Sequence, residues 1–180
     1  MAIFLLAFAP QTLLYAQNAK GKDCNSPIIL ENKSSISESV DKIDRGQVND
    51  LAGENSPSCL VKGEKYPFWY QFTASKNSSL SFNIEGTDGT NWDWVIYELT
   101  DNCENKIELA CNGALNMICS NTGASTTRKN SYNPQVCDES NPFNDDINLN
   151  KGSTYILFLN CTDCRQGDSF NLTFDGRGRF

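Results

Sequence analysis

Two oxygen-rich segments carry residue types that suit a metal site. Calcium takes about six to eight oxygen ligands from carboxylates, amides and carbonyls, and loops at one end of a β-sandwich can bring such groups together. Each segment leads into an expected strand, so we expect the two to converge at one edge of the fold and bind calcium. Turn formation is the alternative role, because Asn and Asp are common turn residues. The candidate ligands are Asp88, Asn91 and Asp93 in TDGTNWDW, and Asn144, Asp145 and Asp146 in NPFNDD.

The chain contains no histidine. This excludes most hydrolase triads and most catalytic zinc sites, which depend on an imidazole. A carboxylate pair drawn from Glu64, Asp93 or Glu98 would suit a glycan hydrolase, but only at a separation that sequence does not give. Acidic residues usually solvate a protein surface. We therefore expect no enzymatic activity.

Aromatic residues could form a flat platform for a sugar ring. Strand alternation places most of them in a core, while Trp92 lies in a polar turn and is the expected exposed, ligand-binding member. The cluster consists of Phe68, Trp69, Tyr70, Phe72, Trp92, Trp94 and Tyr97.

Short apolar or alternating runs separated by Asn, Gly, Ser and Asp predict strands. In TYILFLN (154–160) both faces are apolar, which predicts a central strand covered on both sides. The pattern predicts an all-β fold, a two-sheet antiparallel sandwich of jelly-roll type. The expected strands are Pro27–Leu30, Ser34–Ser39, Phe68–Ala74, Leu80–Ile84, Trp94–Leu99, Ile107–Cys111, Thr154–Asn160 and Phe170–Phe174.

Eight cysteines indicate a disulfide framework, because exported domains use bridges to supplement their cores. Sequence cannot fix the pairing, but short loops favour Cys24–Cys59, Cys103–Cys111, Cys119–Cys137 and Cys161–Cys164. A zinc site is disfavoured by the single C-x-x-C and the missing histidines. A redox role for Cys161 and Cys164 is disfavoured because the motif follows a strand and does not open a helix.

Residues 1–19 are expected to be a signal peptide, since a short apolar stretch ends in small and polar residues. Residues 20–180 are expected to form one domain, with a long, aperiodic insertion at about 112–146 that is either a shaped surface or a spacer. The net charge of −7 argues against nucleic-acid partners and anionic membranes. No further segment is apolar enough to insert directly into a membrane. We expect a secreted or cell-surface protein.

Three blocks carry a resemblance to a known family: SCLVKGEKYPFWYQFTA (58–74), SLSFNIEGTDGTNWDWVIYELTDNC (79–103) and INLNKGSTYILFLN (147–160). They resemble the jelly-roll domain found in surface and secreted proteins of gliding, type IX-secreting bacteria. That domain is similar to the pre-peptidase C-terminal and CUB-like sandwiches. The resemblance implies a non-catalytic adhesion module in which Asp93 is a calcium ligand.

These observations predict an extracytoplasmic binding or adhesion module, stabilised by calcium, whose partner is a protein or a glycan at the cell surface. The contact is expected at one end of the sandwich and at the 112–146 insertion. A structural subunit of an outer-membrane or cell-surface complex is the first alternative. A glycan-binding protein or carboxylate-dependent glycan hydrolase is the second.

Overall fold

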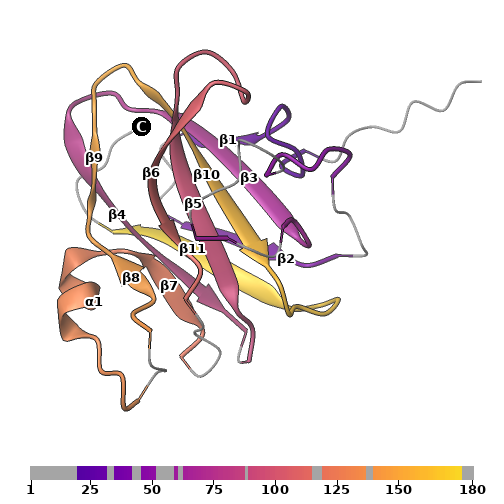
Figure 1. The fold of residues 1–180 in the computed structure, drawn as a ribbon, viewed down its shortest axis with the longest axis vertical. Helices are drawn as coiled ribbons and strands as arrows, with labels where there is room; N and C mark the ends of the chain where they lie inside the picture. The colour runs from indigo at the N-terminus through magenta and orange to yellow at the C-terminus, as the bar shows by residue number, and fades with distance from the viewer. Residues whose placement is uncertain are drawn as a thin grey trace, which may run out of the picture.

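Alternating apolar residues along short strands build two packed sheets (Figure 1). The computed structural model describes residues 20–31, 35–41, 46–51, 59–60, 63–87, 89–114, 119–136 and 140–175. The expected signal peptide, residues 1–19, lies outside them. The five-stranded sheet has the order β1 (Ile28–Ile29), β3 (Pro67–Thr73), β10 (Thr154–Cys161), β5 (Trp92–Leu99) and β6 (Lys106–Asn112).

The six-stranded sheet packs against one face of the five-stranded sheet. Its order is β2 (Ser35–Ser39), β11 (Ser169–Asp175), β4 (Ser78–Gly86), β7 (Asn121–Ala124) and β8 (Phe143–Asn144), and β9 (Ile147–Leu149) pairs with β4. All eight expected strands are present, which confirms the all-β sandwich. The sheets are not wholly antiparallel, however. β1 pairs with β3 and β7 with β8 in parallel, each over two residues at a sheet edge.

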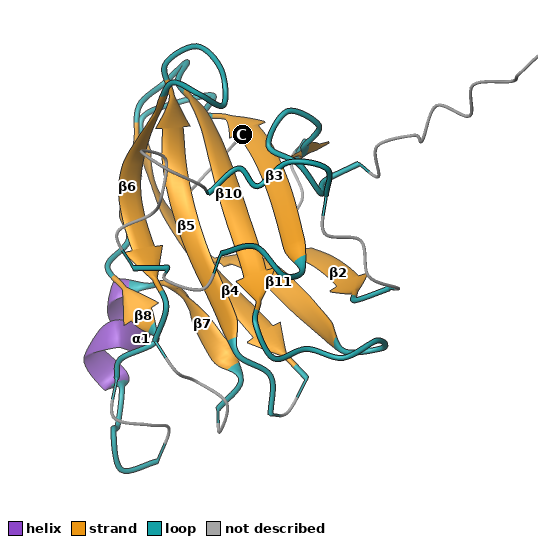
Figure 2. Ribbon diagram, turned by 45° about the vertical axis from the view of Figure 1, so that its right-hand side comes forward, coloured by secondary structure: helices purple, strands orange, loops and turns teal. Residues whose placement is uncertain are grey.

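The central core lies between the two sheets. It includes Phe82 and Ile84 of β4 and Trp94 and Ile96 of β5. A second apolar cluster covers the outer face of the five-stranded sheet, where Trp69, Val95, Ile156 and Phe158 are buried beneath Leu51 and Leu60, among others. β10 lies between β3 and β5 and is buried on both faces, as its double apolar pattern predicts (Figure 2).

The insertion at about 112–146 is more ordered than its sequence predicts. It contains β7, β8 and a helix, α1 (Thr126–Ser131), which lies beside these two strands in Figure 1. The strands are too short to show a period. The helix buries no residue and therefore carries no apolar stripe; the Ser125 side chain caps it by accepting a hydrogen bond from the N–H of Arg128. Among the described residues, no helix has the length and apolarity needed to cross a membrane.

Two of the expected disulfide pairings are wrong. Cys24 is bonded to Cys103 and Cys59 to Cys111, with Cα–Cα distances of 5.9 and 5.8 Å. Cys103 lies in the turn before β6, and Cys111 lies near the other end of this strand. Residues 106 to 111 of the extended strand span about 17 Å, whereas the Cα atoms of a disulfide lie within about 7 Å of each other. The Cys161–Cys164 bridge is confirmed. Cys119 is disulfide-bonded, but its expected partner, Cys137, lies outside the described residues.

Candidate functional site

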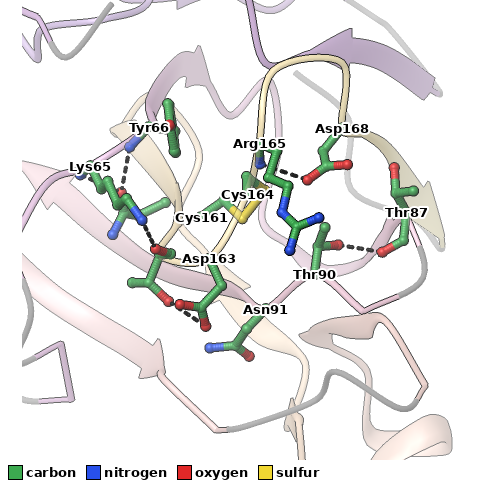
Figure 3. Close-up of a disulfide and its surroundings, with 12 residues drawn as sticks. Lys65, Tyr66, Thr87, Thr90, Asn91, Cys161, Asp163, Cys164, Arg165 and Asp168 are labelled. Carbon is green, nitrogen blue, oxygen red and sulfur yellow. Dashed lines mark hydrogen bonds between the residues drawn. A yellow bond between two sulfur atoms is a disulfide. The ribbon is translucent and has the colours of Figure 1, made fainter. Parts of the chain in front are cut away.

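The strand registers bring the β4–β5 turn and the β10–β11 loop to one end of the sandwich. Cys161 lies opposite Trp92, and Phe170 lies opposite Gly86. Figure 3 shows Thr90 and Asn91 of the turn near Asp163 and Arg165 of the loop, which is closed by the Cys161–Cys164 bridge. We call this surface the loop end.

Two of the predicted calcium ligands, Asn91 and Asp93, lie at the loop end. Both are buried, and Asn91 Nδ2 donates a 3.2 Å hydrogen bond to Asp93 Oδ1. Asp88 lies outside the described residues. Buried amides and carboxylates of this kind stabilise a turn by bonding to each other.

The second predicted segment is held elsewhere, by helix α1. Asp145 forms a 2.5 Å ion pair with Lys129, and Asp146 Oδ1 accepts a 2.8 Å hydrogen bond from the N–H of Thr126. Within the described ranges, no group of three or more Asp, Glu, Cys or His residues could hold a metal ion. The predicted ligands are therefore not brought together there, and calcium binding stays a prediction.

Trp92 is not an exposed platform. It is 1% exposed, and its ring packs against Phe68 and Phe170 at centroid distances of 6.0 and 4.5 Å. The expectation that it is exposed is wrong because Trp92 is already the first residue of β5, where its side chain joins Trp94 and Ile96 in the central core.

The candidate carboxylates of a glycan hydrolase are dispersed along β5. Asp93 and Glu98 are five residues apart, about 17 Å along an extended strand, and face opposite sides of it. Glycosidase carboxylates lie about 5–9.5 Å apart. Glu64 lies in a different group, with Asp23 and Asp50, on the outer face of the five-stranded sheet.

The buried side chain of Asn160, 1% exposed, fixes the segment that leads into β3. Its Oδ1 accepts hydrogen bonds from the N–H groups of Lys65 (2.9 Å) and Tyr66 (3.2 Å), and its Nδ2 donates to the carbonyl of Gly63 (3.0 Å). Lys65 Nζ also donates to the carbonyl of Thr162. The segment and the β10–β11 loop are therefore tied together (Figure 3).

A pocket of about 500 Å³ lies at the corner of the loop end, between the edge strands β1 and β2. We call it the corner pocket. Its aromatic wall contains half-buried Tyr66 and buried Phe68. Lys22 Nζ lies 3.6 Å from the centroid of the Phe68 ring and donates to the carbonyl of Pro67 at 3.2 Å. The remaining polar lining consists of Lys20, Glu38, Ser39, Asp41 and Gln166.

Sequence reasoning missed the corner pocket. Its lining comes from four segments that span residues 20 to 166, and no local motif links them. One signal was available at Tyr66, which directly precedes Pro67 at the start of β3, where an aromatic side chain can remain partly accessible.

Comparison with known proteins found no family model and no curated protein that matches the chain. The resemblance to jelly-roll domains of surface proteins therefore stays a prediction.

Proposed function

We propose that this protein is a non-catalytic, extracytoplasmic binding module that takes a cell-surface glycan in the corner pocket. The disulfides favour an oxidising compartment, since thiols remain reduced in the cytosol. The single observation that carries the proposal is the pocket itself, which combines an aromatic wall with polar groups of both hydrogen-bonding kinds.

The pocket suits a saccharide in size and chemistry. At about 500 Å³ it is in the range of small-molecule sites, roughly 300–1,000 Å³. Tyr66 supplies a flat apolar face, on which the C–H side of a sugar ring can pack. Sugar hydroxyls both donate and accept hydrogen bonds; Lys20 and Gln166 can donate to them, while Glu38 and Asp41 can accept from them.

The charges of the pocket favour a neutral ligand. Two lysines, Lys20 and Lys22, oppose two carboxylates, Glu38 and Asp41. A strongly charged ligand would be attracted by the pair of opposite charge and repelled by the pair of like charge. Saccharide binding should therefore depend only weakly on salt.

The wall that carries Tyr66 is also pre-organised. Asn160 holds the backbone of Tyr66, and the Cys161–Cys164 bridge holds the adjoining loop. A site fixed before binding loses less conformational entropy when the ligand arrives.

An array of neutral cell-surface oligosaccharides tests the proposal with three proteins: the wild type, Tyr66→Ala and Tyr132→Ala. We expect the wild type to bind at least one saccharide and Tyr66→Ala to bind it about tenfold more weakly, a loss of about 1.4 kcal/mol. Tyr132→Ala removes the same side chain from the loop after α1 and should bind like the wild type. No binding by the wild type would overturn the proposal.

A role as a structural subunit is the second candidate, favoured by exposed aliphatic residues on edge strand β6. Ile107 is 55% and Leu109 is 37% exposed, and Leu109 borders a groove of about 560 Å³ along α1 and β8. Recovery of the protein from native membranes at stoichiometric yield with one envelope protein, lost in Leu109→Lys, would support this role.

A further inference from the structure

Three acidic residues from separate segments meet on the outer face of the five-stranded sheet. Asp23 belongs to the segment 20–26, Asp50 to 46–51 and Glu64 to 63–66. The N–H of Cys24 donates a 2.8 Å hydrogen bond to Asp50 Oδ2, and the N–H of Asp50 donates a 3.1 Å hydrogen bond to Glu64 Oε2. The three segments are thus connected in series through the acidic side chains. We call Asp23, Asp50 and Glu64 the acidic cluster.

Asp23 is fitted closely into this arrangement. Its Oδ1 accepts hydrogen bonds from the N–H groups of Gln47 (2.7 Å) and Val48 (2.9 Å). Gly46 has a φ of +75°, and a Cβ atom there would lie 2.5 Å from Asp23 Oδ1. Glycine is therefore required at this turn, both for its backbone conformation and for the close approach of the carboxylate.

Two oxygens of the cluster are buried and have no hydrogen-bond partner among the described residues. They are Oδ2 of Asp23, a residue only 3% exposed, and Oε1 of Glu64. A buried acceptor that lacks a donor lowers the stability of the fold, because its lost hydrogen bonds to water are not replaced. A proton on Glu64 would turn one of these acceptors into a donor and would also remove one negative charge from the cluster.

The groups that face Glu64 leave the cluster negative. Its charged or titratable neighbours are Asp23 and Asp50, Lys106 on β6 and Tyr97 on β5, and Glu108 of β6 lies near Tyr97 in turn. Lys106 is the one cation among them, and its Nζ donates to the carbonyl of Cys103 at 2.7 Å. The indole of Trp69 lies beside Glu64 but does not meet hydrogen-bond geometry.

Burial raises the pKa of Glu64 to about 8, with a further increase from nearby Asp50. Burial also raises the pKa of Asp50 and lowers that of Lys106, while Asp50 and Glu64 oppose the change at Lys106. Glu64 is therefore mostly protonated at neutral pH. Above pH 8 it releases its proton to water and becomes a third carboxylate in a covered space.

We propose that the acidic cluster is a proton-operated latch, which holds the segment 20–24 against the five-stranded sheet while Glu64 is protonated and loosens it when Glu64 ionises. The same segment supplies Lys20 and Lys22 to the corner pocket, and its Gly21 carbonyl accepts a 2.8 Å hydrogen bond from the N–H of Trp69. The latch therefore regulates one wall of that pocket. This consequence for ligand binding rests on the proposed function, whereas the latch itself does not.

The Cys24–Cys103 bridge limits how far the latch can open. It ties the segment to the β5–β6 turn whatever the charge on Glu64. Loosening should therefore be local, confined to the hydrogen bonds of Cys24, Gln47, Val48 and Asp50 with the acidic side chains.

Amide hydrogen exchange without ligand tests the latch directly. In the wild type we expect the protection factors of the Cys24, Gln47, Val48 and Asp50 amides to fall at least tenfold between pH 6.5 and 9, while those of β10 stay constant. Glu64→Gln keeps the size of the side chain without its charge and should abolish the fall. Glu85→Gln, on the exposed face of β4, should behave like the wild type. Unchanged protection in the wild type, or an equal fall in Glu64→Gln, would overturn the latch.

A second variant and a second measurement keep the test decisive if Glu64→Gln folds poorly. Asp23→Asn retains Oδ1 and removes one neighbouring charge, so Glu64 should ionise at lower pH. The indole N–H resonance of Trp69, next to Glu64, should report this as a titration midpoint below that of the wild type. A titration midpoint in Asp23→Asn equal to that of the wild type would contradict the proposed repulsion between Asp23 and Glu64.

If the array identifies a saccharide, the affinity of the wild type for it should fall over the same pH range, and the affinity of Glu64→Gln should not. If the array identifies none, hydrogen exchange still tests the latch.

Discussion

Oδ1 of Asn160, a buried residue near the end of the central strand β10, accepts a 3.2 Å hydrogen bond from the N–H of Tyr66, which lines the corner pocket. A core residue thereby sets the position of a candidate ligand-binding residue. The same amide bonds to Lys65 and Gly63, so it replaces with one side chain the strand partners that residues 63–66 lack. Loss of the Asn160 side chain should therefore both displace this wall of the pocket and lower the stability of the fold.

Asn160→Ala should lower the free energy of unfolding by about 2 kcal/mol or more, because it leaves buried backbone groups without partners. Urea unfolding measures the loss. Asn148→Ala, on the exposed side of β9, is the control and should change stability by less than about 0.5 kcal/mol. Equal stability of the two variants would show that the Asn160 hydrogen bonds are replaced by water.

Trp92→Ala should destabilise the fold by about 3–5 kcal/mol, the usual cost of removing a buried aromatic side chain from a packed core. The ring fills the space between Phe68 and Phe170. Thermal and urea unfolding would detect the change, with Tyr132→Ala as an aromatic control outside the core. A variant that keeps wild-type stability but loses ligand binding would restore the idea of an exposed Trp92.

The alternation of apolar residues predicted the strands well because burial on one face leaves a period of two in the sequence, as in Leu80, Phe82 and Ile84. The double apolar face of TYILFLN likewise predicted the central position of β10. The candidate site was less predictable. Asn and Asp next to a strand are equally common as calcium ligands and as turn residues. The contacts of Asp145 and Asp146 with α1 depend on the tertiary fold, which the local sequence does not reveal.

Disulfide pairing escaped prediction for a similar reason. Short loops are the cheapest to close, which favoured Cys24–Cys59, but the covering segments of the five-stranded sheet bring Cys24 to Cys103 across 79 residues. Long-range packing decided the pairing, and it leaves no local pattern in the sequence.

Loss of the Cys24–Cys103 bridge should cost more than loss of Cys161–Cys164. A bridge stabilises by restricting the unfolded chain, so a separation of 79 residues corresponds to about 4.5 kcal/mol and a separation of 3 to about 2 kcal/mol. The variants Cys24→Ser/Cys103→Ser and Cys161→Ser/Cys164→Ser, compared by urea unfolding, measure both. If the short bridge contributes more, native-state packing around the β10–β11 loop would outweigh loop entropy.

The acidic cluster should make stability fall as pH rises. Glu64 has a pKa near 4.5 in an unfolded chain and about 8 in the folded protein. Below pH 4.5 both states hold the proton, and the favourable contribution is complete. Between pH 4.5 and 8 only the folded state holds it, so unfolding releases a proton and becomes easier at each higher pH. Above about pH 8 both states are ionised, and the loss is complete.

Glu64→Gln should therefore unfold at a urea concentration that depends less on pH between 5 and 9 than that of the wild type. The raised pKa of Asp50 acts in the same direction, so a residual slope should remain at the acidic side of this range. Glu85→Gln, which lies outside the cluster, should keep the full wild-type slope. A wild-type midpoint that rises with pH across this range would reverse the predicted sign, and it would show that Glu64 is ionised and stabilised in the folded protein.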